Sequence, residues 1–245
     1  MSKIAGSSSS NRSSGSGTTM DDEKPPKLDL IESKFSDALR SRTIKIISLQ
    51  GHEFFIHEEL LCRESEKFKK QLRGDFKEAQ TGVIPDVEEP PELLGIFFEY
   101  LYREGWVMNP DIKYTSQYPL LVRLYCMGER LCAESFKEAV LWKFETTLGQ
   151  RGLSDDEIVD MLAVVHTELP PRKRKDYPLR CLVLWYVAAG ITRLKDFPLF
   201  RSLVSEQHPE LGAQLLLLAG NSGSARPSYG AKKPEPKFQD EVDFV

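Results

Sequence analysis

Three residues with side chains that can bind a metal lie close together in the sequence. His52, His57 and Cys62 offer two imidazoles and one thiolate, which are groups that zinc prefers as ligands. His52 and His57 are five residues apart in an extended segment, so they fall on opposite faces of a strand, and the set has no fourth ligand. We therefore expect no metal site here, and we expect His57 to be a core histidine that orients the start of the next helix.

The chain contains no arrangement that is typical of an enzyme. Covalent catalysis needs a nucleophile beside a base, and the sequence has no Gly-x-Ser-x-Gly elbow, no glycine-rich phosphate loop and no His-Glu-x-x-His pair. Acidic clusters such as residues 155–157 stand at predicted helix starts, where capping and the helix dipole explain them. We expect no enzymatic activity and no cofactor.

A dense basic tetrad, Arg172, Lys173, Arg174 and Lys175, follows two prolines. A nuclear-import signal and a solvated loop between helices both fit this composition. We expect no nucleic-acid binding, because no aromatic residues interleave the tetrad and because 37 Asp and Glu outnumber 33 Lys and Arg. The apolar runs are far shorter than the roughly 20 residues that cross a bilayer, so we expect no membrane contact either.

Both ends of the chain have a composition that is typical of disorder. Residues 1–27 are rich in Ser, Gly and Thr, and residues 221–245 are rich in Ser, Pro and charged side chains. Phe238, Val242 and Phe244 stand in an acidic setting, where an inert tail and a short docking peptide both fit. We predict disordered tails on either side of a folded part.

The four cysteines lie in apolar or amphipathic stretches, and no two of them form a Cys-x-x-Cys pair. This pattern favours buried free thiols over disulfides or a metal site. Free thiols are typical of a reducing compartment, so we place the protein in the cytoplasm, the nucleus or both.

Between the tails, the first predicted element is a β-hairpin. Residues 43–49 and 52–57 are short runs rich in β-branched and aromatic side chains. Gly51 between them can take the positive φ of a tight turn. A later brief strand at 82–87 contains Pro85, which confines that residue to an edge strand or to the end of a strand.

The other predicted elements are helical. Ser65 is expected to cap one short helix, and Ser154 with Glu157 forms the pattern of a capping box. The helix that begins at Pro90 is apolar on nearly every face, which is typical of a central core helix and also of a helix partly covered by a partner. The expected ranges are 58–62, 65–72, 90–105, 119–131, 136–148, 154–168, 177–189 and 209–219.

The order of these elements is not an alternation of strands and helices in βαβ units. It indicates an α+β domain at residues 28–149, in which a small sheet is packed with helices. An all-α extension at residues 150–220 is expected to follow.

Several short motifs of the first domain follow the order of the BTB/POZ signature. They are residues 30–37 (LIESKFSD), 44–46 (IKI), 51–57 (GHEFFIH), 60–61 (LL), 65–68 (SEKF), 76–79 (FKEA) and 98–102 (FEYLY). Residues 30–148 therefore resemble the BTB/POZ family, and fungal BTB proteins in particular. The resemblance implies a three-stranded sheet, homodimerisation through the first strand and helices, and recruitment of protein partners. Many relatives are substrate adaptors for cullin-RING ubiquitin ligases.

The resemblance also suggests which residues take part in self-association: Phe35, Asp37, His57 and Glu58. Asp37 matches an aspartate that in dimeric relatives faces a basic residue, and that basic residue directly follows the histidine matched by His57. This chain has Glu58 there, and two acids would repel each other if buried together. Arg40 or Arg42 is a candidate for the missing positive charge.

Aromatic residues at and after the core helix are candidates for a partner surface: Tyr102, Trp106, Tyr114 and Tyr118. Such side chains are both ordinary core material and favoured interface anchors. Cullin-binding relatives often carry a hydrophobic-x-Glu motif after the core helix, and residues 106–111 lack that glutamate.

These features predict a protein-interaction module that acts as an oligomerising adaptor or scaffold. A cullin is one candidate partner besides a second copy of the chain. The alternative is a nuclear or transcriptional regulator that uses the basic loop 172–175.

Overall fold

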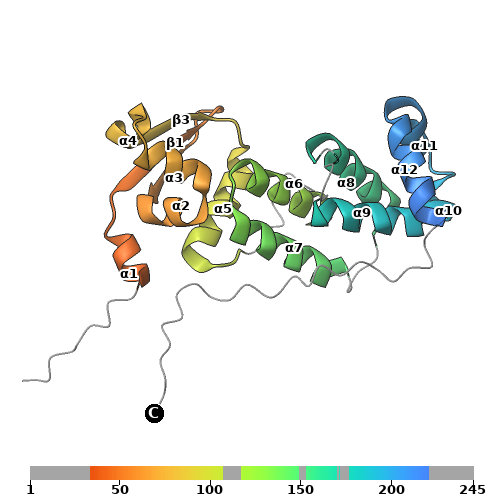
Figure 1. The fold of residues 1–245 in the computed structure, drawn as a ribbon, viewed down its shortest axis with the longest axis horizontal. Coiled ribbons are helices and arrows are strands. Elements are labelled where there is room, and N and C mark those ends of the chain that lie inside the picture. The colour runs from red at the N-terminus through yellow and green to blue at the C-terminus, as the bar shows by residue number, and fades with distance from the viewer. Residues whose placement is uncertain (1–33, 107–116, 149–152, 170, 172–176, 221–245) are drawn as a thin grey trace, which may run out of the picture. The chain divides into compact units, whose positions relative to one another are not determined.

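The computed structural model describes residues 34–106, 117–148, 153–169, 171 and 177–220 (Figure 1). Within these ranges a small three-stranded sheet is combined with many helices, so the fold class is α+β. The sheet has the order β2-β1-β3, in which β1 (Thr43–Ser48) pairs antiparallel with β2 (Glu53–His57) and parallel with β3 (Val83–Val87). The predicted hairpin and edge strand are confirmed, and Gly51 in the hairpin turn has a φ of +81°.

One face of the sheet contributes to the hydrophobic core. Ile44 and Ile46 of β1 are fully buried on this face. Phe54 of β2 lies against Phe98 of helix α5 (Pro91–Arg103), with the two ring centroids 5.1 Å apart in an edge-to-face arrangement. The hairpin and the apolar core helix therefore share one core, as the sequence indicates.

Four short helices accompany the sheet: α1 (Lys34–Leu39), α2 (Glu58–Glu64), α3 (Glu66–Arg73) and α4 (Lys77–Thr81). Ser65 caps α3 as predicted, because its Oγ accepts a hydrogen bond of 3.2 Å from the backbone amide of Phe68. Helices α1 and α4 were not predicted, since each spans fewer than two turns and carries little hydrophobic periodicity.

The predicted helical hairpin consists of α6 (Gln117–Arg130) and α7 (Glu134–Leu148). Helix α8 (Asp155–Glu168) follows, and it begins with the predicted capping box. Ser154 Oγ accepts a hydrogen bond of 3.3 Å from the amide of Glu157, and the Glu157 carboxylate accepts one of 2.8 Å from the amide of Ser154.

The cysteines are free thiols, but they are not all buried. Cys62 and Cys126 are buried, Cys181 is half-buried and Cys132 is exposed. Cys132 lies in the turn between α6 and α7 with a φ of +52°, where the chain reverses direction at the surface. The prediction of buried thiols therefore holds for two cysteines and is wrong for Cys132.

The C-terminal part is entirely helical within the residues that the structure describes. Its elements are α9 (Pro178–Ala189), α10 (Ile191–Leu194), α11 (Pro198–Ser202), the π-helix η1 (Leu203–Gln207) and α12 (Pro209–Gly220). Helix α9 contacts both α8 and α12. The two predicted helices are present, whereas α10, α11 and η1 are too short for their periodicity to be read from sequence.

Buried apolar side chains of the sheet region and of the C-terminal helices form one cluster, which extends from Ala38 to Leu215. The predicted division into domains at residue 149 stays a prediction. Among the described helices, none combines the length and the apolar character that crossing a membrane requires.

Candidate interaction surfaces

The carboxylates proposed for a dimer contact are both paired within the chain. Glu58, half-buried at the start of α2, forms an ion pair with Arg42. Asp37, exposed on α1, lies 3.4 Å from Arg40. Each of the two acidic side chains thus has a basic partner in the same chain, and their part in self-association stays a prediction.

His57 occupies the N-cap position of α2 and is half-buried. Its backbone amide donates a hydrogen bond of 3.2 Å to the Tyr102 hydroxyl, and its ring Nδ1 lies 2.8 Å from the same oxygen. His57 therefore links the start of α2 to the end of α5, at the margin of the core rather than inside it. Tyr102 is held in this contact and is itself half-buried.

Two of the aromatic partner-surface candidates belong to the core. Tyr118 is fully buried, and its hydroxyl donates a hydrogen bond of 3.1 Å to the carbonyl of Thr147. Trp106 is buried against Phe136, with ring centroids 5.6 Å apart. Tyr118 packs α6 against α7, and Trp106 packs against Tyr100 of α5 and Phe136 of α7, so neither side chain offers an exposed partner surface. Tyr114 and the basic tetrad at 172–175 lie outside the described residues.

Arg130 forms ion pairs that join segments far apart in the sequence. Arg130 at the end of α6 makes two hydrogen bonds of 2.7 Å to the Glu89 carboxylate, which is almost fully buried, and it also pairs with Glu168 at the end of α8. The hydrogen bond to Glu89 is the main reason why the pKa of Arg130 lies above its usual range. These charges hold the ends of α6 and α8 to the segment before α5.

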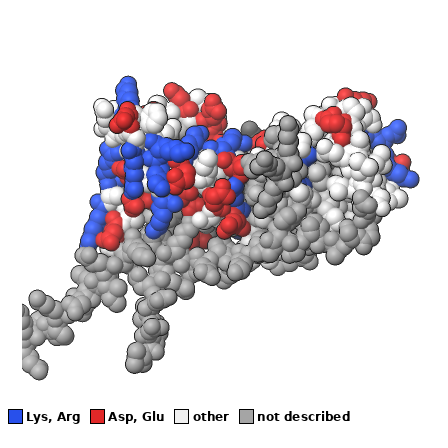
Figure 2. Space-filling model, in the orientation of Figure 1, with Lys and Arg blue, Asp and Glu red and all other residues white. Residues whose placement is uncertain are grey.

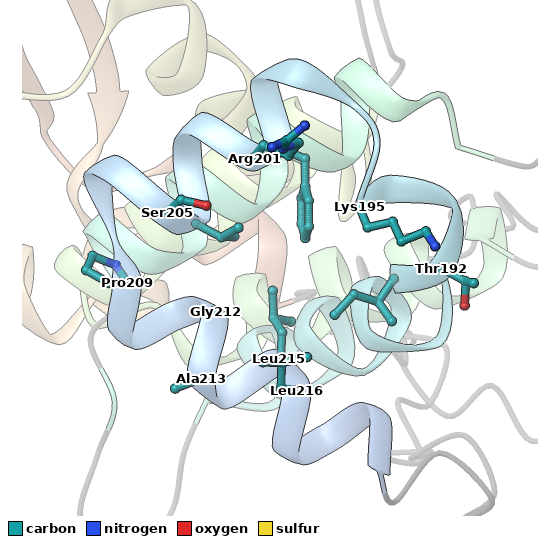
Figure 3. A pocket seen from close by; sticks show the side chains of 12 residues that line it. Thr192, Lys195, Arg201, Ser205, Pro209, Gly212, Ala213, Leu215 and Leu216 are labelled. Atoms are coloured by element: carbon teal, nitrogen blue, oxygen red, sulfur yellow. The ribbon is translucent and has the colours of Figure 1, made fainter.

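An apolar pocket of about 670 Å³ opens between α10, α11, η1 and α12 (Figure 3). Phe200, Val204, Leu215 and Leu216 are among its apolar lining residues. Two basic residues, Lys195 and Arg201, also line it, and Figure 3 shows them on separate segments at the pocket. A cavity of this size and composition suits apolar side chains of a ligand better than polar chemistry.

Large apolar side chains are exposed beside this pocket. Leu216 and Leu217 of α12 are 67% and 73% exposed, and Leu199 of α11 is 56% exposed. Figure 2 shows charged residues crowded over the elements around the sheet, whereas the visible face of the C-terminal helices is largely uncharged. This surface was not predicted, because the pocket is formed where α12 packs against short helices, and no local sequence pattern predicts that arrangement.

A second set of residues that sequence analysis missed lies where α8 and α12 meet. His166, His208 and Glu210 come together there, although 42 residues separate the two histidines. Burial is the main cause that lowers the pKa of His166; His208 lowers it further, and Glu210 acts in the opposite direction. Of the four histidines, His166 and His208 are far apart in the sequence, and the fold brings their rings into contact.

A scan against models of protein families gave no match, and a search of curated proteins found no similar sequence. The fold class and the surface therefore define the chain only as an α+β protein with an apolar pocket and exposed apolar side chains on its C-terminal helices.

Proposed function

We propose that this chain is a non-enzymatic protein-interaction module, an oligomerising adaptor or scaffold built on a BTB/POZ-like domain. The order of elements supports this proposal: a hairpin, three short helices, a third strand parallel to the first, a core helix and a helical hairpin. This order agrees with what the resemblance of residues 30–148 implies. The buried charges described above serve structural contacts, which also favours a role without catalysis.

The observation that carries the proposal is the apolar surface of the C-terminal helices. Exposed apolar patches next to a preformed pocket are typical of binding sites, since water contact with them is unfavourable. The pocket suits the apolar face of an amphipathic helix from a partner protein. Acidic side chains at the margin of that helix would meet Lys195 and Arg201.

Another exposed apolar side chain lies on α1. The family resemblance links α1 to self-association. Leu39 is 39% exposed there, close in sequence to Asp37. We propose that α1 contributes to contact between two copies of the chain. Self-association through one element and partner binding through others is the arrangement that an adaptor requires.

Size-exclusion chromatography with light scattering tests the self-association. We expect the full chain to have twice its mass of 27.9 kDa, and we expect Leu39→Glu to reduce it to one chain. Leu199→Glu is the matched control, because it places the same charge at an exposed leucine on another helix. A single-chain mass for the unmodified protein at every concentration would reject the oligomerising role.

The role of ubiquitin-ligase adaptor is a more specific form of the proposal, and the family resemblance alone supports it. Direct titration of the full chain with a purified cullin tests it. Saturable binding would support this form, and its absence would restrict the proposal to a general scaffold.

A further inference from the structure

Three potential metal ligands converge where α8 ends and α12 begins. His166 lies in the last turn of α8, His208 lies between η1 and α12, and Glu210 lies in the first turn of α12. Their candidate ligand atoms all lie within 4.8 Å of one another. No local motif links these residues. The tertiary fold therefore brings the two imidazoles and the carboxylate together.

One carboxylate oxygen faces both imidazoles. Glu210 Oε1 lies 2.9 Å from His166 Nε2 and 3.6 Å from His208 Nδ1. The two imidazole rings are in contact, with centroids 4.3 Å apart. The side chains are 13%, 30% and 58% exposed for His166, His208 and Glu210, so the cluster is screened on one side and open to ions on the other.

Hydrogen bonding within the described residues uses only part of this ligand set. The contact from His166 Nε2 to Glu210 is an ordinary imidazole–carboxylate hydrogen bond. The 3.6 Å separation at His208 is too long for a hydrogen bond. The other ring nitrogen of His166, Nδ1, is buried and has no hydrogen-bond partner among the described residues.

We propose that His166, His208 and Glu210 bind a first-row divalent transition-metal ion, and that Zn²⁺ is the ion that binds best. Imidazole nitrogen and carboxylate oxygen are the donors that such ions prefer, and water would complete a tetrahedral shell. Zinc bonds of about 2.0–2.1 Å place ligand atoms roughly 3.4 Å apart in a tetrahedron. The His166 and Glu210 atoms at 2.9 Å are already closer than this, and even a separation at the 4.8 Å limit exceeds it by little more than an ångström.

The positive charge of Arg180 also acts on His166 and opposes a cation. The Arg180 guanidinium is buried and donates a hydrogen bond of 2.9 Å to Gln214 of α12. With three protein ligands and this charge nearby, we expect weaker binding than at a four-ligand structural zinc site. An exchangeable ion fits this arrangement better than a permanent one.

Bound metal would join α8 to α12 and so support one wall of the apolar pocket. Pro209, which lies between His208 and Glu210 in the sequence, lines that pocket together with Gly212 and Ala213. A ligand that binds only the folded state stabilises it by mass action. The metal site does not depend on the proposed function, although it adjoins the proposed binding surface.

Equilibrium dialysis of the full, untagged chain against Zn²⁺, followed by metal analysis, tests the site. We expect one Zn²⁺ per chain and a rise in melting temperature with added Zn²⁺. His208→Gln and Glu210→Gln are both expected to weaken binding at least tenfold and to abolish the thermal shift. Both side chains are partly exposed, and circular dichroism checks that the variants are folded.

Two variants remove potential ligands elsewhere and serve as controls. His52→Gln and Cys132→Ser, at exposed positions, are expected to bind Zn²⁺ as the unmodified chain does. Failure of the unmodified chain to take up stoichiometric Zn²⁺ would overturn the proposal. Uptake that persists in His208→Gln and Glu210→Gln, or that is lost in a control variant, would overturn it equally.

Discussion

The buried carboxylate of Glu64 accepts a hydrogen bond of 2.7 Å from the backbone amide of Phe136, 72 residues further along the chain. Phe136 lies in the first turn of α7, where backbone amides have no partner within the helix. A negative charge there also interacts favourably with the helix dipole. Next to it, Ser65 Oγ donates a hydrogen bond of 2.6 Å to the carbonyl of Leu131. The junction of α2 and α3 thus holds the turn of the α6–α7 hairpin.

Replacing Glu64 should therefore destabilise the fold. We expect Glu64→Ala to lower the free energy of unfolding by about 1–3 kcal/mol, because a buried amide loses its acceptor. Glu64→Gln keeps an acceptor oxygen at the same position and should retain most of the stability. Urea denaturation of the three proteins measures the difference. Equal midpoints for Glu64→Ala and the unmodified chain would show that the contact is not stabilising.

The cysteines should differ sharply in reactivity. Burial raises the pKa of the thiols of Cys62 and Cys126, so little of the reactive thiolate forms at neutral pH. Cys132 is exposed, and we expect it to react first with a thiol-specific reagent under native conditions. Cys132→Ser should remove the fastest phase. A fast phase that persists in this variant would place the exposed thiol elsewhere.

Tyr118 should act through stability and not through partner contact. Its side chain is fully buried against Phe144, with ring centroids 5.8 Å apart. We expect Tyr118→Ala to cost about 3–5 kcal/mol, as for other large-to-small aromatic substitutions in cores. Tyr118→Phe removes only the hydrogen bond to Thr147 and should cost about 1 kcal/mol. Wild-type stability of Tyr118→Ala, measured by thermal denaturation, would contradict this assignment to the core.

Local patterns predicted the elements that have strong signals of their own. The hairpin follows from β-branched runs around Gly51, and the start of α8 follows from the capping box at Ser154. Helices α10 and α11 and the π-helix were not predicted, since an element of four or five residues shows no full period of apolar positions.

The sites depended on tertiary packing, which the sequence does not display. A tyrosine is equally common in cores and at interfaces. Only the burial of Tyr118 on α6, where it contacts Phe144 of α7, shows that it belongs to the core. The apolar pocket and the cluster of His166 with His208 arise from helices packed across long sequence separations. No spacing rule links such residues.

Comparative affinity capture with the full chain tests whether a protein partner docks at the apolar pocket. Leu216→Glu combined with Leu217→Glu places two charges on the exposed face of α12, while Leu49→Glu places one at an exposed leucine in the hairpin turn. We expect partners recovered with the unmodified chain to be lost with the α12 variant and retained with Leu49→Glu. The same partners in the same amounts from all three proteins would contradict a docking role for this surface.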